Sequence, residues 1–171
     1  SNQIISDNLY EHVIPALSGA WWQGPLCTDG TPRGYGIFEV KGNKVKWIYK
    51  STGHADNYQM ILYTGKDYSK FRGDLVANVW ACDDNWVVEA SFDGAAPVKM
   101  TRFSSLDPLA KKLYSSNKGM DHSYVYPTEG DHFYRVDIPK KAISATVTAT
   151  FTKRKNLQSF SIGLRMLSKQ E

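Results

Sequence analysis

The sequence predicts an all-β fold, an antiparallel β-sandwich with one or two short helices. Aromatic residues make up 13% of the 171 residues, and flat rings pack well across neighbouring strands. Short apolar runs separated by turn residues recur along the chain, without the strand and helix alternation of α/β folds. A chain of this length buries roughly 70% of its unfolded surface on folding, so we expect one domain with a sizeable core.

The N-terminal stretch, residues 1–18, predicts a short helix or a linker that precedes the β-sandwich domain of residues 19–171. Apolar residues recur there at helical spacing, at Leu9, Val13, Ile14 and Leu17. Asp7 is placed to cap such a helix, and Pro15 would end or kink it.

The next third of the chain predicts a β-hairpin made of the apolar runs 35–40 and 45–50. Gly42-Asn43 lies between the runs and supplies the positive φ angles that tight hairpin turns require. The first run follows a turn-rich segment, 24–34, that is dense in glycine and proline.

The middle of the chain predicts a further strand at 58–63 and a second hairpin. The runs 75–80 and 86–92 are apolar and are separated by Asp83-Asp84-Asn85, a turn-forming sequence. Asp93-Gly94 follows and is a typical sequence for the turn that ends a strand.

One short helix is predicted between residues 104 and 120. Asp107 is placed as its N-cap, Pro108 as its first residue, and leucines follow at helical spacing. Three consecutive strands with antiparallel pairing are then predicted at 133–138, 145–151 and 157–167.

Charge and hydropathy argue against two classes of partner. The net charge is +4, from 21 basic and 17 acidic residues, and the one basic cluster, Lys153-Arg154-Lys155, is interpreted as a solvated loop. We therefore expect no nucleic-acid partner. No stretch approaches the roughly 20 apolar residues that a spanning helix needs, so no membrane span is predicted.

Cysteine usage leaves the redox state open. Cys27 and Cys82 are too far apart in the sequence for a CxxC redox pair or a zinc knuckle. A disulfide and two free thiols are both compatible with this spacing.

Catalytic motifs are missing from the chain. The four histidines are scattered and form no metal-ligand motif, so they are interpreted as surface or turn residues with satisfied hydrogen bonds; they are His12, His54, His122 and His132. No Gly-x-Ser-x-Gly sequence and no phosphate-binding glycine loop is present. We expect no catalytic residues, no metal ligands and no cofactor in this chain.

Five tryptophans are candidates for a sugar-stacking surface, because exposed flat rings on a β-sandwich suit pyranose faces. Trp47, Trp80 and Trp86 fall within predicted strands and are interpreted as core. Trp22, in a turn beside Trp21, is the best candidate for exposure.

An ordered series of segments resembles the C-terminal domain of bacterial calcineurin-like phosphoesterases. The opening segments are GAWWQGP, CTDGTPRGYGIFEVKGNKVKWIYKSTG and YQMILY. Residues 77–88 resemble that domain's Asn-x-Trp-x-x-Asp-x-x-Trp segment, 106–110 its Asp-Pro helix start, and 127–133 its Thr-x-x-x-His-Phe segment. Residues 145–150 resemble its last strand, whereas the family's closing Asp-Arg-Phe-Gly is replaced by 151–155.

The resemblance implies a parent polypeptide with a metal-dependent phosphoesterase domain on the N-terminal side. That domain would hold the divalent metals through Asp-x-His, Gly-Asn-His-Glu and Gly-His-x-His motifs, none of which occurs in this chain. Residues 7–18 would then be the end of a linker from it. By the same resemblance we expect a periplasmic or extracellular location.

Three functions follow as hypotheses. The first is a non-catalytic accessory domain that packs on or roofs its parent's catalytic domain and helps to select a phosphorylated or glycan substrate. The alternative is a carbohydrate-binding module of a secreted protein, and the third is an oligomerisation domain. Turn residues at one end of a sandwich are the candidates for binding, namely Trp22, Asp29, Arg33, His54 and His132.

Overall fold

The computed structural model describes residues 2–6, 9–115, 122–152 and 158–165. In chain order the strands are β1 (Asn2–Ser6), β2 (Leu9–His12), β3 (Gly34–Lys41), β4 (Lys44–Ser51), β5 (Met60–Thr64), β6 (Asp74–Val79), β7 (Trp86–Phe92), β8 (Val98–Lys99), β9 (Thr101–Leu106), β10 (Glu129–Asp137), β11 (Ser144–Phe151) and β12 (Gln158–Arg165). The helical elements are the 3-10 turns η1 (Ala20–Trp22) and η2 (Ser69–Phe71) and the helix α1 (Pro108–Tyr114).

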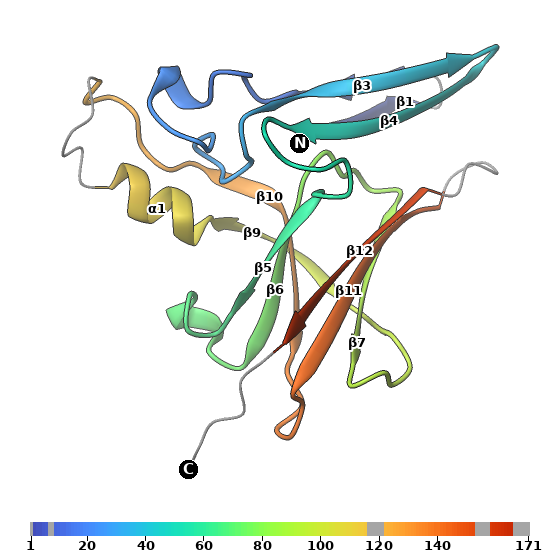
Figure 1. Ribbon diagram of the computed structural model, residues 1–171, viewed down its shortest axis with the longest axis vertical. Helices are drawn as coiled ribbons and strands as arrows, with labels where there is room; N and C mark the ends of the chain where they lie inside the picture. Colours follow the sequence, from blue (N-terminus) through green and yellow to red (C-terminus); the bar gives the residue numbers. More distant parts are fainter. Residues whose placement is uncertain (1, 7–8, 116–121, 153–157, 166–171) are drawn as a thin grey trace.

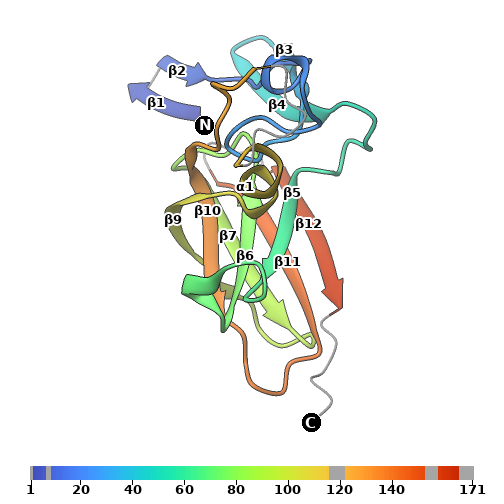
Figure 2. The same cartoon turned by 90° about the vertical axis from the view of Figure 1, so that its left-hand side faces the viewer.

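The predicted antiparallel β-sandwich is confirmed. One sheet has the strand order β5-β6-β10-β9 and the other the order β12-β11-β7-β8, and the two pack against each other (Figure 1). Two further two-stranded sheets, β1-β2 and β3-β4, lie across one end of the sandwich (Figure 2).

The main core lies between the two four-stranded sheets. In β7 the side chains alternate between buried and half-buried along the strand, as expected for a sheet with one face on the core. The buried side chains between the sheets include Leu75, Ala77, Val79, Val88, Ala90, Val147 and Ala149. Trp80 and Trp86 are buried as predicted, and Trp47 at 9% exposure is also part of this core.

Strand β6 is buried on both faces. Its second face packs against an aromatic cluster around Tyr63, Tyr68 and Phe133, and α1 lies over the end of this layer (Figure 2). Polar side chains on β6 are therefore enclosed by protein and need hydrogen-bond partners within it.

The hairpin predicted over 35–50 is confirmed as β3-β4, with Phe38 opposite Trp47. Gly42 in its turn has φ +61°, the left-handed conformation that glycine adopts without strain. The hairpin projects from the sandwich as a long arm whose tip lies far from the sheets (Figure 1). We call residues 34–51 the β-arm.

The N-terminal helix prediction is wrong. Residues 9–12 form β2 and pair with β1, residues 13–16 are irregular, and residues 7–8 lie outside the described part of the chain. The apolar residues at helical spacing, Leu9, Val13, Ile14 and Leu17, are all exposed. Their spacing therefore marks no buried helix face, and the backbone groups of β2 are paired in a hairpin instead. That residues 1–18 serve as a linker stays a prediction.

The second predicted hairpin is also wrong, because β6 and β7 belong to different sheets. β6 pairs with β5 and β10, whereas β7 pairs with β11 and β8. The connection between them crosses from one sheet to the other through Ala81, whose φ is +54°, and the buried Cys82. Two apolar runs and a polar turn look the same in sequence whether the strands pair or cross the sandwich.

The C-terminal strands follow the prediction in part. β11 and β12 pair antiparallel over eight residue pairs, but β10 joins the other sheet. Residues 153–157, which include the basic triplet, lie outside the described part of the chain. Among the described residues no helix is long and apolar enough to cross a membrane.

The predicted start of α1 is confirmed. Asp107 accepts hydrogen bonds from the amides of Leu109 at 2.9 Å and Ala110 at 3.0 Å, and Pro108 is the first helical residue. An N-cap of this kind stabilises a helix by about 1 kcal/mol. The Asp93-Gly94 turn is also present, and both residues have positive φ, as in a type I′ turn.

Candidate functional site

Strand β10 contains a β-bulge between Gly130 and Phe133. Gly130 lies opposite Ser105 and Phe133 opposite Phe103, so β10 has one residue more than β9 over this interval. A bulge of this kind re-aims side chains. The rings of His132 and Phe133, although consecutive, stack with centroids 5.1 Å apart and planes at 21°.

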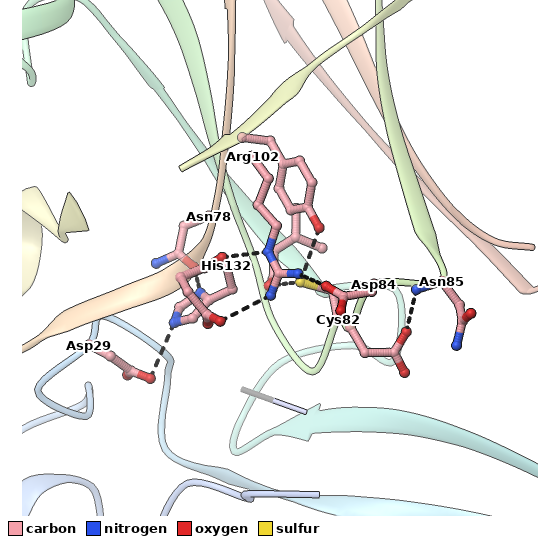
Figure 3. Close-up of polar contacts among 11 residues, drawn as sticks. Asp29, Asn78, Cys82, Asp84, Asn85, Arg102 and His132 are labelled. Carbon is pink, nitrogen blue, oxygen red and sulfur yellow. Dashed lines mark hydrogen bonds and ion pairs between the residues drawn. The ribbon is translucent and has the colours of Figure 1, made fainter. Parts of the chain in front are cut away.

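The interpretation of His132 as a surface or turn residue is wrong, because His132 lies within β10 and is almost fully buried. It joins two distant parts of the chain. Its Nδ1 lies 2.6 Å from Oδ1 of Asn78 on β6. Its Nε2 lies 3.3 Å from Oδ2 of Asp29, in the loop before β3 (Figure 3). The bulge therefore links the central strand of one sheet to the loop that precedes the β-arm.

Both nitrogens of His132 face hydrogen-bond acceptors. Asn78 uses its Nδ2 to donate to Oδ2 of Asp107 at 3.0 Å, so its oxygen is the atom that faces His132. The partner on the other side is a carboxylate of Asp29. Each ring nitrogen therefore has an acceptor oxygen within hydrogen-bond distance, one from an amide and one from a carboxylate.

Asp29, His132, Asn78 and Asp107 form one hydrogen-bond network. Asp107 is its second centre and is fully buried. Besides Asn78 and the two amides of α1, it accepts a hydrogen bond from the hydroxyl of Tyr63 at 2.7 Å. Four donors thus surround one carboxylate, which is how proteins accommodate a buried charge. The helix cap predicted from sequence is also the point at which α1 is fastened to β5 and β6.

Two glycines allow these groups to approach each other. A Cβ atom at Gly130 would lie 2.4 Å from Nε2 of His132, and one at Gly30 would lie 2.1 Å from Cγ of Asp107. Gly30 also has φ +85°, which other residues rarely adopt. Larger residues at either position would displace the network.

Asp29 is the member of the network that reaches solvent, with 24% of its side chain exposed. Burial on its own would raise the pKa of Asp29, but the hydrogen bond and charge of His132 and the hydrogen bonds of Thr31 outweigh it and lower the pKa to about 2. One of those bonds joins the Thr31 amide to Oδ1 at 2.9 Å. Asp29 is therefore an anion at neutral pH.

An open cleft of about 500 Å³ lies above this pair. Its polar lining includes Cys27, Asp29, Ser104, Thr128, Glu129 and His132. One wall is closed where the hydroxyls of Thr28 and Thr128 meet at 2.8 Å. Carboxylates and hydroxyls of this kind suit a ligand rich in hydroxyl or amino groups.

The cleft shows no activated nucleophile among its described residues. Burial, with the nearby Asp29 charge, raises the pKa of the Cys27 thiol to about 11, and a protonated thiol is a poor nucleophile. Cys82 is buried, and its thiol donates to the carbonyl of Val79 at 3.2 Å. Both cysteines are free thiols, so of the two states compatible with the sequence the structure has the unbridged one.

Arg102 fastens the bulge from its other side. Its guanidinium donates to the carbonyl of Asp131 at 2.6 Å and pairs with the Asp84 carboxylate at 2.5 Å (Figure 3). The bulge is thus tied to the β6–β7 connection as well. Among the described residues, no group of three or more His, Cys, Asp or Glu side chains is placed to hold a metal ion.

The structure brings together two of the five predicted binding residues, Asp29 and His132. Arg33 and His54 are exposed and are not among the described residues that line the cleft. His54 instead stacks on Tyr58 with ring centroids 4.3 Å apart. The side chain of Trp22 lies outside the described part of the structure.

Sequence reasoning missed Asn78 and Tyr63 as members of the network and assigned Asp107 only a capping role. One signal was available for Asn78. A single amide inside the apolar run 75–80 has to find a buried partner when its strand is central. Nothing local in the sequence indicates the tyrosine.

A scan against protein-family models identifies the chain. Residues 11–156 match the model for the C terminal of calcineurin-like phosphoesterase. No curated protein and no solved structure matches the chain. The matched region begins within β2, extends past the end of β11 and includes Asp29, Asn78 and His132. The resemblance predicted from the sequence motifs is confirmed, and the chain belongs to the family of C-terminal domains of calcineurin-like phosphoesterases.

Proposed function

We propose that this domain is a non-catalytic accessory domain that packs on the catalytic domain of its parent phosphoesterase. The packing surface is the β-arm together with the strand pair β1-β2, which we call the N-terminal hairpin. The observation that carries the proposal is an arm with exposed apolar side chains on both faces, in a domain whose family is described as the C terminal of calcineurin-like phosphoesterase. Hydrolysis would belong to the other domain, because the metal-binding motifs of these enzymes do not occur in this chain.

The β-arm exposes more apolar surface than an isolated hairpin tolerates well. Val40 is 69% exposed, and its cross-strand partner Val45 is 43% exposed. Ile37 is also exposed, on the opposite face of β3. Within the described part of the chain β3 and β4 pair only with each other. A two-stranded hairpin is marginally stable alone, and exposed apolar clusters of this kind are typical of interaction surfaces.

The N-terminal hairpin extends the same surface. Ile5, Leu9 and Val13 are each more than half exposed, and β1-β2 lies at the same end of the molecule as the β-arm (Figure 2). This is also the end at which the chain enters the domain. A preceding domain would therefore meet this surface without a long connection.

The position of the cleft supports a role in substrate selection. Val13 and Pro15, which follow β2, line the cleft together with Asp29. A catalytic domain seated on the N-terminal hairpin would border the cleft, and the Asp29 carboxylate would face the junction. There it would accept hydrogen bonds from hydroxyl or amino groups of a bound phosphoester.

A binding experiment in trans tests this docking surface. The separately produced N-terminal domain of the same polypeptide is titrated with this chain by calorimetry. A Val40→Glu/Val45→Lys variant keeps opposite charges across the strand pair and should lower the affinity at least about tenfold. The control is Val98→Glu. Val98 is 52% exposed and lies on β8, in the sheet β12-β11-β7-β8. Equal affinities for both variants and the parent chain would exclude the β-arm as the docking surface.

A further inference from the structure

Trp21 presents a large aromatic ring to solvent from a strained backbone. Its φ and ψ are +52° and +38°, a left-handed conformation that is strained for a bulky residue. The residue is 54% exposed, so packing in the core does not compensate for the strain. Conformational strain at a residue that the core does not need is a sign of a binding role.

The Trp21 ring forms a corner with two other aromatic rings. Its centroid is 5.4 Å from that of Tyr124, and the two planes are at 89°. His122 lies parallel to Tyr124, with centroids 5.1 Å apart and planes at 17°, and stands at 81° to Trp21. We call Trp21, His122 and Tyr124 the aromatic corner.

A buried base holds the aromatic corner in place. Ala20 and Val125, the chain neighbours of Trp21 and Tyr124, are buried together with Ala110 and Tyr114 of α1. The two backbones are thus fixed on the helix while the side chains next to them stay outside. The corner is pre-organised, which lowers the entropic cost of binding a ligand.

We propose that the aromatic corner binds a carbohydrate by stacking on the face of a pyranose ring. An exposed indole offers a flat apolar surface that matches the C–H face of such a ring. The Tyr124 hydroxyl and the His122 imidazole are donors and acceptors at its edge and suit the ring's hydroxyl groups. A ligand with one apolar face and a polar rim satisfies both kinds of group.

This site is separate from the docking surface. Residues 20–22, drawn in blue, lie on the side of the molecule away from the tip of the β-arm (Figure 1). A domain docked on the arm would leave the corner accessible. The carbohydrate site therefore does not rest on the docking proposal, and each can fail without the other.

Trp21→Gly is the variant that separates binding from folding. Glycine adopts positive φ without strain, so removal of the exposed indole should leave the unfolding midpoint of the chain unchanged or raise it. Tyr124→Ala removes the other wall, and Tyr35→Ala is the matched control, because Tyr35 is an exposed tyrosine on β3. Trp21→Ala has the same truncation but keeps the strain, and should be less stable than Trp21→Gly.

The probes are cellohexaose, laminarihexaose and xylohexaose, with choline chloride as a test of a cation-binding corner. Calorimetry on the 171-residue chain should detect millimolar or tighter binding of at least one saccharide. Trp21→Gly and Tyr124→Ala should each weaken it at least about tenfold, and Tyr35→Ala should not. Absence of binding to all three saccharides, equal binding by Trp21→Gly, or binding of choline alone would overturn the proposal.

Discussion

His132 and Asp29, which are 103 positions apart in the chain, meet at 3.3 Å at the floor of the cleft. The contact depends on the bulge in β10, which aims the imidazole at the loop before β3. It joins the loop to the central strand β6 through Asn78. The Asp29 carboxylate is thereby held at the cleft surface with the His132 imidazole behind it.

His132→Phe should destabilise the domain by about 3 kcal/mol. The phenyl ring fills similar space but leaves Oδ1 of Asn78 and Oδ2 of Asp29 without the imidazole, and unpaired buried polar groups each cost about 1–3 kcal/mol. Urea unfolding followed by tryptophan fluorescence measures the change. A loss under 0.5 kcal/mol, estimated as typical for a surface site, would show that the network does not stabilise the fold.

Acid should selectively weaken the Asp29 contact. The pKa of Asp29 is lowered from 3.8 to about 2, so its stabilising contribution is complete above pH 4 and is lost as the pH falls through 2. The shift corresponds to about 2 kcal/mol. Urea midpoints measured across this range should fall less steeply for Asp29→Asn than for the parent chain. Parallel curves would contradict the assigned ion pair.

Removal of the Asp107 carboxylate should cost more than removal of any one of its donors. Asp107→Ala deletes the cap of α1 and leaves the Tyr63 hydroxyl and Nδ2 of Asn78 without their acceptor, at an expected cost of about 3–5 kcal/mol. Tyr63→Phe removes one of four hydrogen bonds and should cost about 1 kcal/mol. Chemical denaturation of both variants checks the order. The reverse order would place the centre of the network at the tyrosine.

Gly130→Ala should disturb the same site through shape alone. The new methyl group would lie 2.4 Å from Nε2 of His132, and relief of such overlap costs about 1–3 kcal/mol. Gly73→Ala is the matched control, since a Cβ there meets no atom within 4 Å. Thermal unfolding of the two variants gives the comparison. Similar midpoints would mean that the bulge accommodates a side chain.

The sequence was informative where structure is local. Gly42-Asn43, Asp93-Gly94 and the Asp107-Pro108 helix start each determine a turn or cap through the conformations of one or two residues, and all three are present in the structure. The family motifs were similarly recognisable, because they are short and occur in order.

Long-range pairing was not accessible in the same way. The runs 75–80 and 86–92 are compatible with a hairpin and also with a connection that crosses between sheets. The structure has the crossing, because β6 pairs with β5 on one edge and with β10 on the other. The Asp29–His132 pair likewise depends on a bulge that no local pattern marks. Leu9 and Val13 have the spacing of an apolar helix face, although they belong to no helix. Both are exposed and lie on a surface that the isolated domain leaves uncovered.

The proposed burial of the β-arm against the parent's catalytic domain would slow amide hydrogen exchange in β3 and β4. Amide hydrogen exchange, measured by mass spectrometry on the full-length polypeptide and on this chain alone, tests it most directly. We predict slower exchange in full-length protein for peptides from β3 and β4, with unchanged exchange in β11 at the centre of the sandwich. Identical exchange of the arm peptides in the two proteins would contradict burial of the β-arm.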